Sequence, residues 1–198
     1  MNVQPIRLEG PSLVLEPLTV EHAAELWPKA DPEIFLHTLD WPRDSGLEAF
    51  ADWLREGLAR PETLLFLMRT RPELEAVGTT GYLDIRPQHR GLEIGRTWIA
   101  KSHQGTRVNP ESKYLLLRHA FEDLGAARVQ FKTDVNNLHS QRAIEKLGAR
   151  REGVLRRFQV RANGFVRDTM VFSIIAEEWP EVKAGLEARL GLGDGSGD

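Results

Sequence analysis

The chain has 198 residues, a formal net charge of −3 at pH 7 and no cysteine. This length suits one well-buried core and is too short for two full domains. Without cysteine there is no disulfide, no thiolate nucleophile and no cysteine-based metal site, and the acidic balance argues against nucleic acid as the main partner. The first residues lack an apolar secretory core and no run approaches membrane-spanning length, so we expect a cytoplasmic protein that does not enter a membrane.

The first part of the chain predicts two helices set among three strands. Thr19 is the expected N-cap of the first helix. The pattern Ser45-x-x-Glu48 is that of a capping box, and it predicts a second helix that continues to about Arg60. Runs rich in apolar and β-branched residues predict the three strands, at 12–18, 64–69 and 77–85.

A turn that suits an anion follows the next predicted strand, at 92–100. Asn109 is the expected N-cap of a helix that opens at Pro110, with the carboxylate of Glu111 in its first turn. The free N–H groups and the macrodipole of such a helix end can hold a phosphate. The alternative is an ordinary capped helix after a loop. Apolar residues recur at helical spacing along this helix, at Tyr114, Leu117, Phe121 and Leu124.

A strand, a helix and a hairpin are expected after that. The strand is predicted at 127–135, and the helix that follows begins near Asn137 and stops at Gly148. Asn163-Gly164 is the strongest hairpin signal of the chain. The hairpin strands are predicted at 154–162 and 165–175.

One domain is expected over residues 1–190. A last helix at about 176–190 ends it, and the Gly-rich segment 191–198 is expected to be a disordered tail. The six histidines show no spacing typical of a metal site, so we expect no metal.

The order of strand, anion-type turn, helix and strand, followed by a helix headed by Asn137-x-x-Ser140, resembles the GNAT superfamily of acetyl-coenzyme A (acetyl-CoA)-dependent N-acetyltransferases. The strand segment Glu93-Ile94-Gly95, the run Ser-x-x-Ala-Ile-Glu-Lys-Leu-Gly-Ala at 140–149 and Arg-Glu-Gly-Val-Leu-Arg at 151–156 resemble the RimJ/RimL-type enzymes, which acetylate protein N-termini. The resemblance implies an α/β fold: a GNAT-like three-layer sandwich with a mixed central β-sheet of about seven strands, flanked by helices.

Acetyl-CoA is the cosubstrate that the resemblance implies. Asn137 would bind its pantetheine arm, although its alternative role is a helix N-cap. The family usually has Gly where Arg107 stands and Gly or Ala where Asn109 stands. Arg107 could compensate by pairing with a phosphate, and Asn109 could do so as the helix cap. The residues expected to contact the coenzyme are Trp98, Ile99, Ala100, Gln104, Gly105, Thr106, Arg107, Val108, Asn109 and Asn137.

Acetyl transfer to an amine needs a base, an oxyanion donor and a proton for the leaving thiolate. Glu93 is the candidate base, directly or through water, with a solvated carboxylate or an ion pair with Arg96 as the alternative. The backbone N–H of Ile99 is the candidate oxyanion donor, because a bulge in its strand would leave that group free. The family's tyrosine position holds Ile144 here, so Ser140 is the candidate acid, with helix capping as its alternative role.

The predicted function is therefore direct attack of an amine on acetyl-CoA in a ternary complex. The acceptor is expected to be a protein or peptide N-terminus, with a small amine as the alternative. His37, Asp40 and Trp41 are expected to line the acceptor cleft, and for Trp41 a packing role is the alternative. Two further interpretations stay open: an acetyl-CoA-binding sensor or scaffold without turnover, and a homodimer in which the hairpin strand pairs across a two-fold axis. The arginines at 150, 151, 156, 157, 161 and 167 fit either a solvated face or a site for the ribose phosphate or an acidic substrate.

Overall fold

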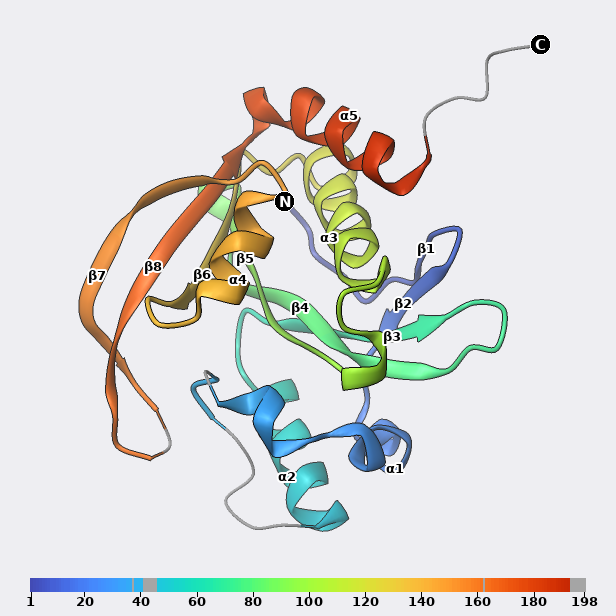
Figure 1. The fold of residues 1–198 in the computed structure, drawn as a ribbon. Coiled ribbons are helices and arrows are strands. Elements are labelled where there is room, and N and C mark those ends of the chain that lie inside the picture. Colours follow the sequence, from blue (N-terminus) through green and yellow to red (C-terminus); the bar gives the residue numbers. More distant parts are fainter. Residues whose placement is uncertain (37, 41–45, 162, 193–198) are drawn as a thin grey trace.

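The computed structural model describes residues 1–36, 38–40, 46–161 and 163–192. Their strands form one mixed eight-stranded sheet in the order β1-β2-β3-β4-β5-β6-β8-β7, in which β5 and β6 are the parallel pair (Figure 1). The strands are β1 (Leu8–Glu9), β2 (Leu13–Pro17), β3 (Leu64–Thr70), β4 (Ala76–Arg86), β5 (Gly91–Ile99), β6 (Arg128–Asp134), β7 (Arg150–Val160) and β8 (Val166–Ile175). The expected mixed α/β sandwich is confirmed, with the short β1 as the additional strand.

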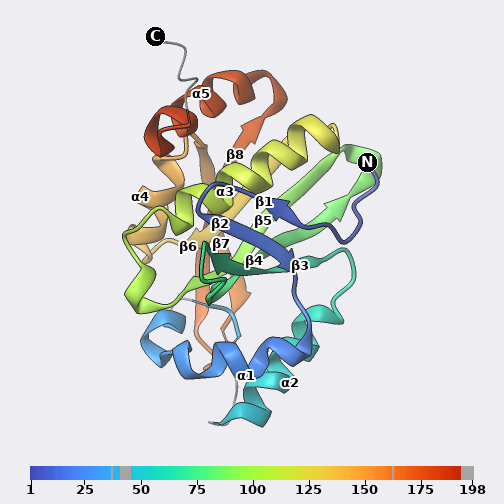
Figure 2. The same cartoon turned by 90° about the vertical axis from the view of Figure 1, so that its right-hand side faces the viewer.

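Helices cover both faces of this sheet, with α3 and α5 on one side and α1 and α2 on the other (Figure 2). The α-helices are α1 (Ala23–Leu26), α2 (Leu47–Leu58), α3 (Val108–Arg118), α4 (Leu138–Glu145) and α5 (Trp179–Leu190). Short 3₁₀ turns are η1 (Val20–His22), η2 (Trp27–Lys29), η3 (Pro32–Phe35), η4 (Pro87–His89), η5 (Lys101–His103) and η7 (Ala176–Glu178), and a π-turn, η6 (His119–Asp123), extends α3.

Strand alternation divides the apolar residues between two cores. In β3, Phe66 and Met68 join the core shared with α3, α4 and α5, whereas Leu65 and Leu67 join the core shared with α1 and α2. The sheet is therefore buried on both faces where β3 crosses it, as the near-continuous apolar run of this strand requires.

The start of α3 differs from the prediction. Arg107 is the N-cap residue and α3 begins at Val108, so Asn109 lies inside the first turn and is not the cap. Pro110 lies at the third helical position, where its missing N–H costs nothing because the first N–H groups of a helix have no intrahelical partner. The hydroxyl of Thr106 instead accepts a hydrogen bond from the N–H of Val108 (3.3 Å).

The ends of other helices follow local signals with small shifts. Gly46 is the N-cap of α2 and caps it without a side chain, whereas Ser45, the predicted cap, lies outside the described residues. Gly148 has a φ of +95° just beyond α4, as the predicted stop requires. Gly191 ends α5 with a φ of +64°, and residues 193–198 of the predicted tail lie outside the described residues.

The predicted hairpin joins β7 and β8. Gly164 has a φ of +83° in its turn. β7 begins at Arg150, earlier than expected, and it is the edge strand beside β8, exposed along most of its length.

Candidate active site

A gap between β5 and β6 is the central feature of the site. The two strands pair only over Gly91–Glu93 with Arg128–Gln130, and they part beyond Glu93 (Figure 1). A bulge accompanies the separation: Trp98 pairs with Thr79 and Gly95 with Gly81, so two residues of β5 lie opposite one residue of β4. The expected bulge in this strand is therefore present, and it lies in the half of β5 that no longer pairs with β6.

The backbone of Ile99 faces this gap. The N–H of Ala100 donates to the carbonyl of Val77, on the β4 side (2.8 Å). Because backbone groups of successive strand residues point to opposite edges, the N–H and carbonyl of Ile99 point away from β4. The side chain of Gln104 donates to that carbonyl (3.0 Å), which ties the following turn to the end of β5.

The turn before α3 offers several unused backbone donors. Within the described residues, the N–H groups of Gly105, Thr106, Arg107 and Asn109 donate no hydrogen bond. Gly105 has a φ of +75°, and a Cβ there would meet nothing within 4 Å. The turn therefore combines free N–H groups with the positive end of α3, which are the elements of an anion site.

Arg107 lies at this turn but has protein partners. Its guanidinium donates to the carbonyl of Leu190 at the end of α5 (2.7 Å), and its Nε lies 3.9 Å from the carboxylate of Glu111. Glu111 is fully buried and also accepts from the N–H of Ser12 (2.9 Å). About half of the Arg107 side chain (52%) is exposed, so a phosphate contact stays a prediction.

Asn137 and Ser140 lie at the start of α4, beyond the end of β6. The side-chain oxygen of Asn137 accepts from the N–H of Ser140 (3.0 Å), so Asn137 is the N-cap. The amide nitrogen of Asn137 and the hydroxyl of Ser140 make no hydrogen bond in the described part of the chain. Since β5 and β6 are parallel, Asn137 and Ile99 lie at the same edge of the sheet, and Asn137 keeps a donor for a ligand there.

Glu93 lies where β5 and β6 part. Its carboxylate is 2.8 Å from Lys132 Nζ on β6, and the side chain is 12% exposed. Burial raises the pKa of Glu93 and the nearby Asp84 adds to this, while the charge of Lys132 opposes it. The alternative partner, Arg96, lies elsewhere: its guanidinium is 3.5 Å from Asp40 and stacks over the ring of Trp53.

Asp40 is part of a polar network beneath α2. Its carboxylate accepts from Trp53 Nε1 (2.9 Å) and from Arg60, and it faces Arg96. Burial favours a higher pKa, but the charge of Arg96 and the bond from Trp53 outweigh it and the pKa of Asp40 is lowered. These contacts favour a structural role, and acceptor binding by Asp40 stays a prediction. His37 and Trp41 lie outside the described residues.

Three predicted coenzyme contacts have buried side chains. Trp98 packs among Phe35 and Phe50 beneath the sheet, and Ala100 and Val108 are almost fully buried. Any contact from these residues with a ligand would therefore use the backbone. Ile144 is also buried in the core, so its side chain is not offered to the gap, and Ser140 lies one turn earlier in the first turn of α4.

The sequence reasoning missed Lys132 and Asp84, which set the electrostatics around Glu93. Lys132 alternates with Gln130 along β6, and both side chains reach Glu93 from the paired strand, at 2.8 and 3.5 Å. The signal was the alternation of β6, which places every second residue on one face. Its register with β5 was not available from the sequence.

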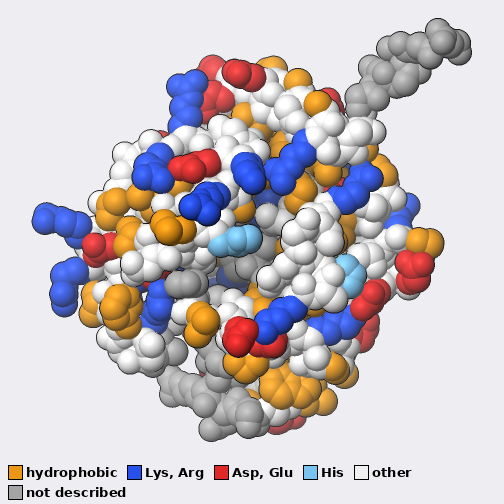
Figure 3. All heavy atoms as spheres, viewed as in Figure 1, with side chains coloured by type: hydrophobic (Ala, Val, Ile, Leu, Met, Phe, Trp, Pro, Cys, Tyr) orange, Lys and Arg blue, Asp and Glu red, His pale blue; other side chains and the backbone are white. Residues whose placement is uncertain are grey.

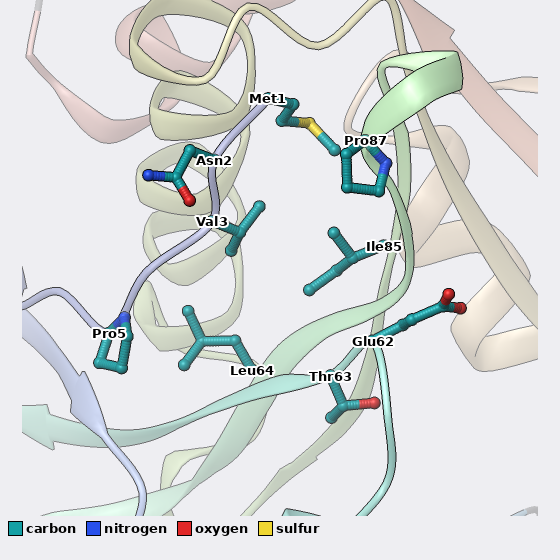
Figure 4. Close-up of a pocket in the computed structure, with 9 residues that line it drawn as sticks. All are labelled: Met1, Asn2, Val3, Pro5, Glu62, Thr63, Leu64, Ile85 and Pro87. Carbon is teal, nitrogen blue, oxygen red and sulfur yellow. The ribbon is translucent and has the colours of Figure 1, made fainter.

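Basic side chains gather above a central recess on the face that Figure 3 shows, which includes α4 and the start of α3. A separate hollow of about 420 Å³ lies at the opposite end of β4 from Ile99. Figure 4 shows Val3, Leu64 and Ile85 lining it, and it includes none of the predicted site residues. The helices of the described residues are all too short or too polar to span a bilayer. Among the same residues, no three acidic or histidine side chains come together as metal ligands do.

The mixed sheet and the gap between its parallel strands are features of a known class of proteins, and comparison with protein families identifies the same class. The family model described as Acetyltransferase (GNAT) domain matches residues 12–150, more than half of the chain. The chain therefore belongs to the GNAT family of acetyltransferases, and the GNAT resemblance is confirmed.

Individual relatives agree with this assignment. A solved structure described as a putative acetyltransferase from T. thermophilus is 43% identical, covers 96% of this chain and 100% of its own, and has a TM-score of 0.90. Mycobacterium smegmatis RimJ in complex with CoA-disulfide shares the fold, at 22% identity, 94% and 95% coverage and a TM-score of 0.75. The Bacillus subtilis (strain 168) protein "Putative ribosomal N-acetyltransferase YdaF" is 33% identical over 46% of this chain and 49% of its own. The chain spans about half the length of the curated relatives it matches.

Proposed function

We propose that this protein transfers an acetyl group from acetyl-CoA to a primary amine, by direct attack in a ternary complex. The observation that carries the proposal is the open gap between β5 and β6. The N–H of Ile99 faces it from β5, and the side-chain amide of Asn137 lies beyond the end of β6, at the same end of the sheet. The free N–H groups that lead into α3 border the same end of the sheet and would receive the pyrophosphate.

Each step of the transfer has a candidate group. Acetyl-CoA supplies the activated acyl carbon and a thiolate leaving group. The N–H of Ile99 would stabilise the developing oxyanion, an effect worth about 10²–10³-fold for one donor. Glu93 would take the proton of the attacking amine, since burial holds its pKa closer to neutrality than that of a solvated carboxyl. Ser140 would protonate the thiolate, because its hydroxyl has no other partner in the described residues.

The acceptor we propose is a protein or peptide N-terminus. The similarity to a protein named as a ribosomal N-acetyltransferase supports this choice, as does the fold shared with RimJ. A small amine is the second candidate, because Glu93 and its polar neighbours would serve any primary amine equally well. A coenzyme sensor without turnover is the third, because Ile144 occupies the family's tyrosine position.

Two measurements on the wild-type chain distinguish these functions. Titration calorimetry measures acetyl-CoA binding, and a thiol-release assay follows turnover with a panel of N-terminal peptides and small amines. We expect micromolar binding and thiol release with one class of peptide. Binding without release from any amine would identify a sensor, release only with small amines would reassign the acceptor, and no binding of any CoA derivative would refute the proposal.

A further inference from the structure

Lys113 is a buried amine that the proposed chemistry does not use. It lies on α3, 6% exposed, and its Nζ contacts two hydroxyls: Thr97 Oγ1 on β5 (2.6 Å) and Thr80 Oγ1 on β4 (3.0 Å). In the described residues it forms no ion pair with a carboxylate. Burial, acting alone, lowers the pKa of Lys113 to about 7. An ammonium without a counter-ion is costly in such a place, so the neutral amine is the form that the surroundings favour.

The cluster lies on the β5 bulge. Thr97 follows Arg96, whose φ of +47° marks the extra residue, and Thr80 is the β4 residue opposite the bulge. The two hydroxyls lie 2.8 Å apart, and Thr97 also lies 3.4 Å from the carbonyl of Gly95. Lys113 therefore joins α3 to the bulge, in the half of β5 that has left β6.

The hydrogen bonds around Lys113 depend on its protonation. A neutral amine can accept the proton of the Thr97 hydroxyl and donate to Thr80, whose own hydroxyl can donate to Thr97, which closes a ring of three bonds. An ammonium has no lone pair, so it donates to both hydroxyls, and the Thr97 proton bonds to Thr80 or to the Gly95 carbonyl instead of to Lys113. The third ammonium N–H then has no acceptor in the cluster. Protonation thus reverses the direction of the hydrogen bond between Lys113 and Thr97, a residue of the bulge itself.

We propose that Lys113 is a positioning residue for acetyl transfer, whose neutral amine, with Thr80 and Thr97, holds the β5 bulge so that the N–H of Ile99 points into the gap. The inference rests on the proposed function, because it assigns Ile99 the oxyanion. Lys113 touches neither substrate. It acts through Thr97 and then Trp98, the one residue of β5 that lies between the bulge and Ile99.

Two variants and a control test this assignment. Lys113→Met removes the amine at similar length, and Thr97→Val removes the hydroxyl at similar shape. The control, Lys183→Met, removes a half-buried lysine of α5 that is paired with Glu122 and lies outside this cluster. We expect Lys113→Met to lower kcat about 10–100-fold, as a misaligned oxyanion donor does, and to leave the Kd for acetyl-CoA within about two-fold. Lys183→Met should change neither. Unchanged kcat in Lys113→Met would overturn the inference.

A second readout does not depend on turnover. In ¹H–¹⁵N spectra, the amides of Gly95, Arg96 and Ile99 should titrate together with a midpoint near pH 7 in the wild type and in Lys183→Met. This titration should vanish in Lys113→Met and in Thr97→Val. Its persistence in both variants, or its absence from the wild type, would overturn the inference. If the wild type acetylates no amine, the proposed function fails while these spectra still decide whether Lys113 controls the bulge.

Discussion

Replacing Lys113 with Met should change how the stability of the protein depends on pH. In the unfolded chain a lysine keeps its proton to about pH 10.5, whereas in the folded chain burial lowers the pKa of Lys113 to about 7. Between these two values, unfolding takes up one proton. The free energy of unfolding of the wild type must therefore rise as pH rises through this window, and this stabilisation is lost as pH falls to about 7.

The magnitude follows from the two pKa values. Each pKa unit corresponds to about 1.4 kcal/mol, so the full window is worth roughly 5 kcal/mol. Loss of the two bonds to Thr80 and Thr97 costs the variant about 1–2 kcal/mol at every pH, and the two hydroxyls can still bond to each other. We therefore expect Lys113→Met to be more stable than the wild type below about pH 7 and of similar stability near pH 10.

Urea unfolding followed by the fluorescence of the five tryptophans measures this difference. Between about pH 7.5 and 9.5, the unfolding free energy of the wild type should rise by about 1.4 kcal/mol per pH unit more than that of Lys113→Met. Lys183→Met should show the pH slope of the wild type over this range, since the bond to Glu122 raises the pKa of Lys183 and keeps this lysine charged in the folded protein. Parallel curves for the wild type and Lys113→Met would show that Lys113 stays protonated in the folded protein, and the reasoning would fail.

Three other changes test the remaining assignments. Glu93→Gln should lower kcat and remove the loss of rate at acidic pH. The raised pKa of Glu93 makes protonation of the base limit the wild-type rate there. An unchanged rate–pH profile would exclude Glu93 as the base. Asn137→Ala should weaken acetyl-CoA binding by about 0.5–1.5 kcal/mol in calorimetry, whereas the exposed neighbour change Asn136→Ala should not; equal effects of the two would remove Asn137 from the site. Asp40→Ala should lower the unfolding free energy by about 1–3 kcal/mol, because it leaves the buried guanidinium of Arg96 without its carboxylate. A loss of activity at unchanged stability would instead favour a role of Asp40 in acceptor binding.

In the turn before α3, Arg107 and Asn109 have structural roles, which differ from the phosphate contact and the helix cap that their residue types suggest. Arg107 donates to the carbonyl of Leu190, so it also joins this turn to the end of α5. Asn109 lies within the first helical turn, and Thr106 accepts the N–H of Val108 in its place. The departures from the family pattern are therefore accommodated by backbone groups and by Thr106, which leaves the N–H groups of the turn free.

Local features were predictable because they depend on a few neighbouring residues. The turn at Asn163-Gly164 and the helix stop at Gly148 need backbone conformations that these residue types adopt at little cost. Asn137 is the cap of α4, as one of its two predicted roles required, because its side chain can reach an N–H three residues along. The family pattern could be recognised for the same reason, since it consists of such local signals in a given order.

The environment of each site residue, by contrast, was decided by the tertiary structure. Strict alternation along β5 would place Trp98 on the same face as Ile94, but the extra residue at the bulge reverses the faces and sends Trp98 to the core beneath α1 and α2. The ion pair of Glu93 with Lys132 and the burial of Lys113 depend on registers and packing between segments far apart in the chain. A sequence can specify which residues prefer a turn, a cap or a strand. Which charged side chains form ion pairs, and which amine is desolvated, depends on how distant strands and helices pack together.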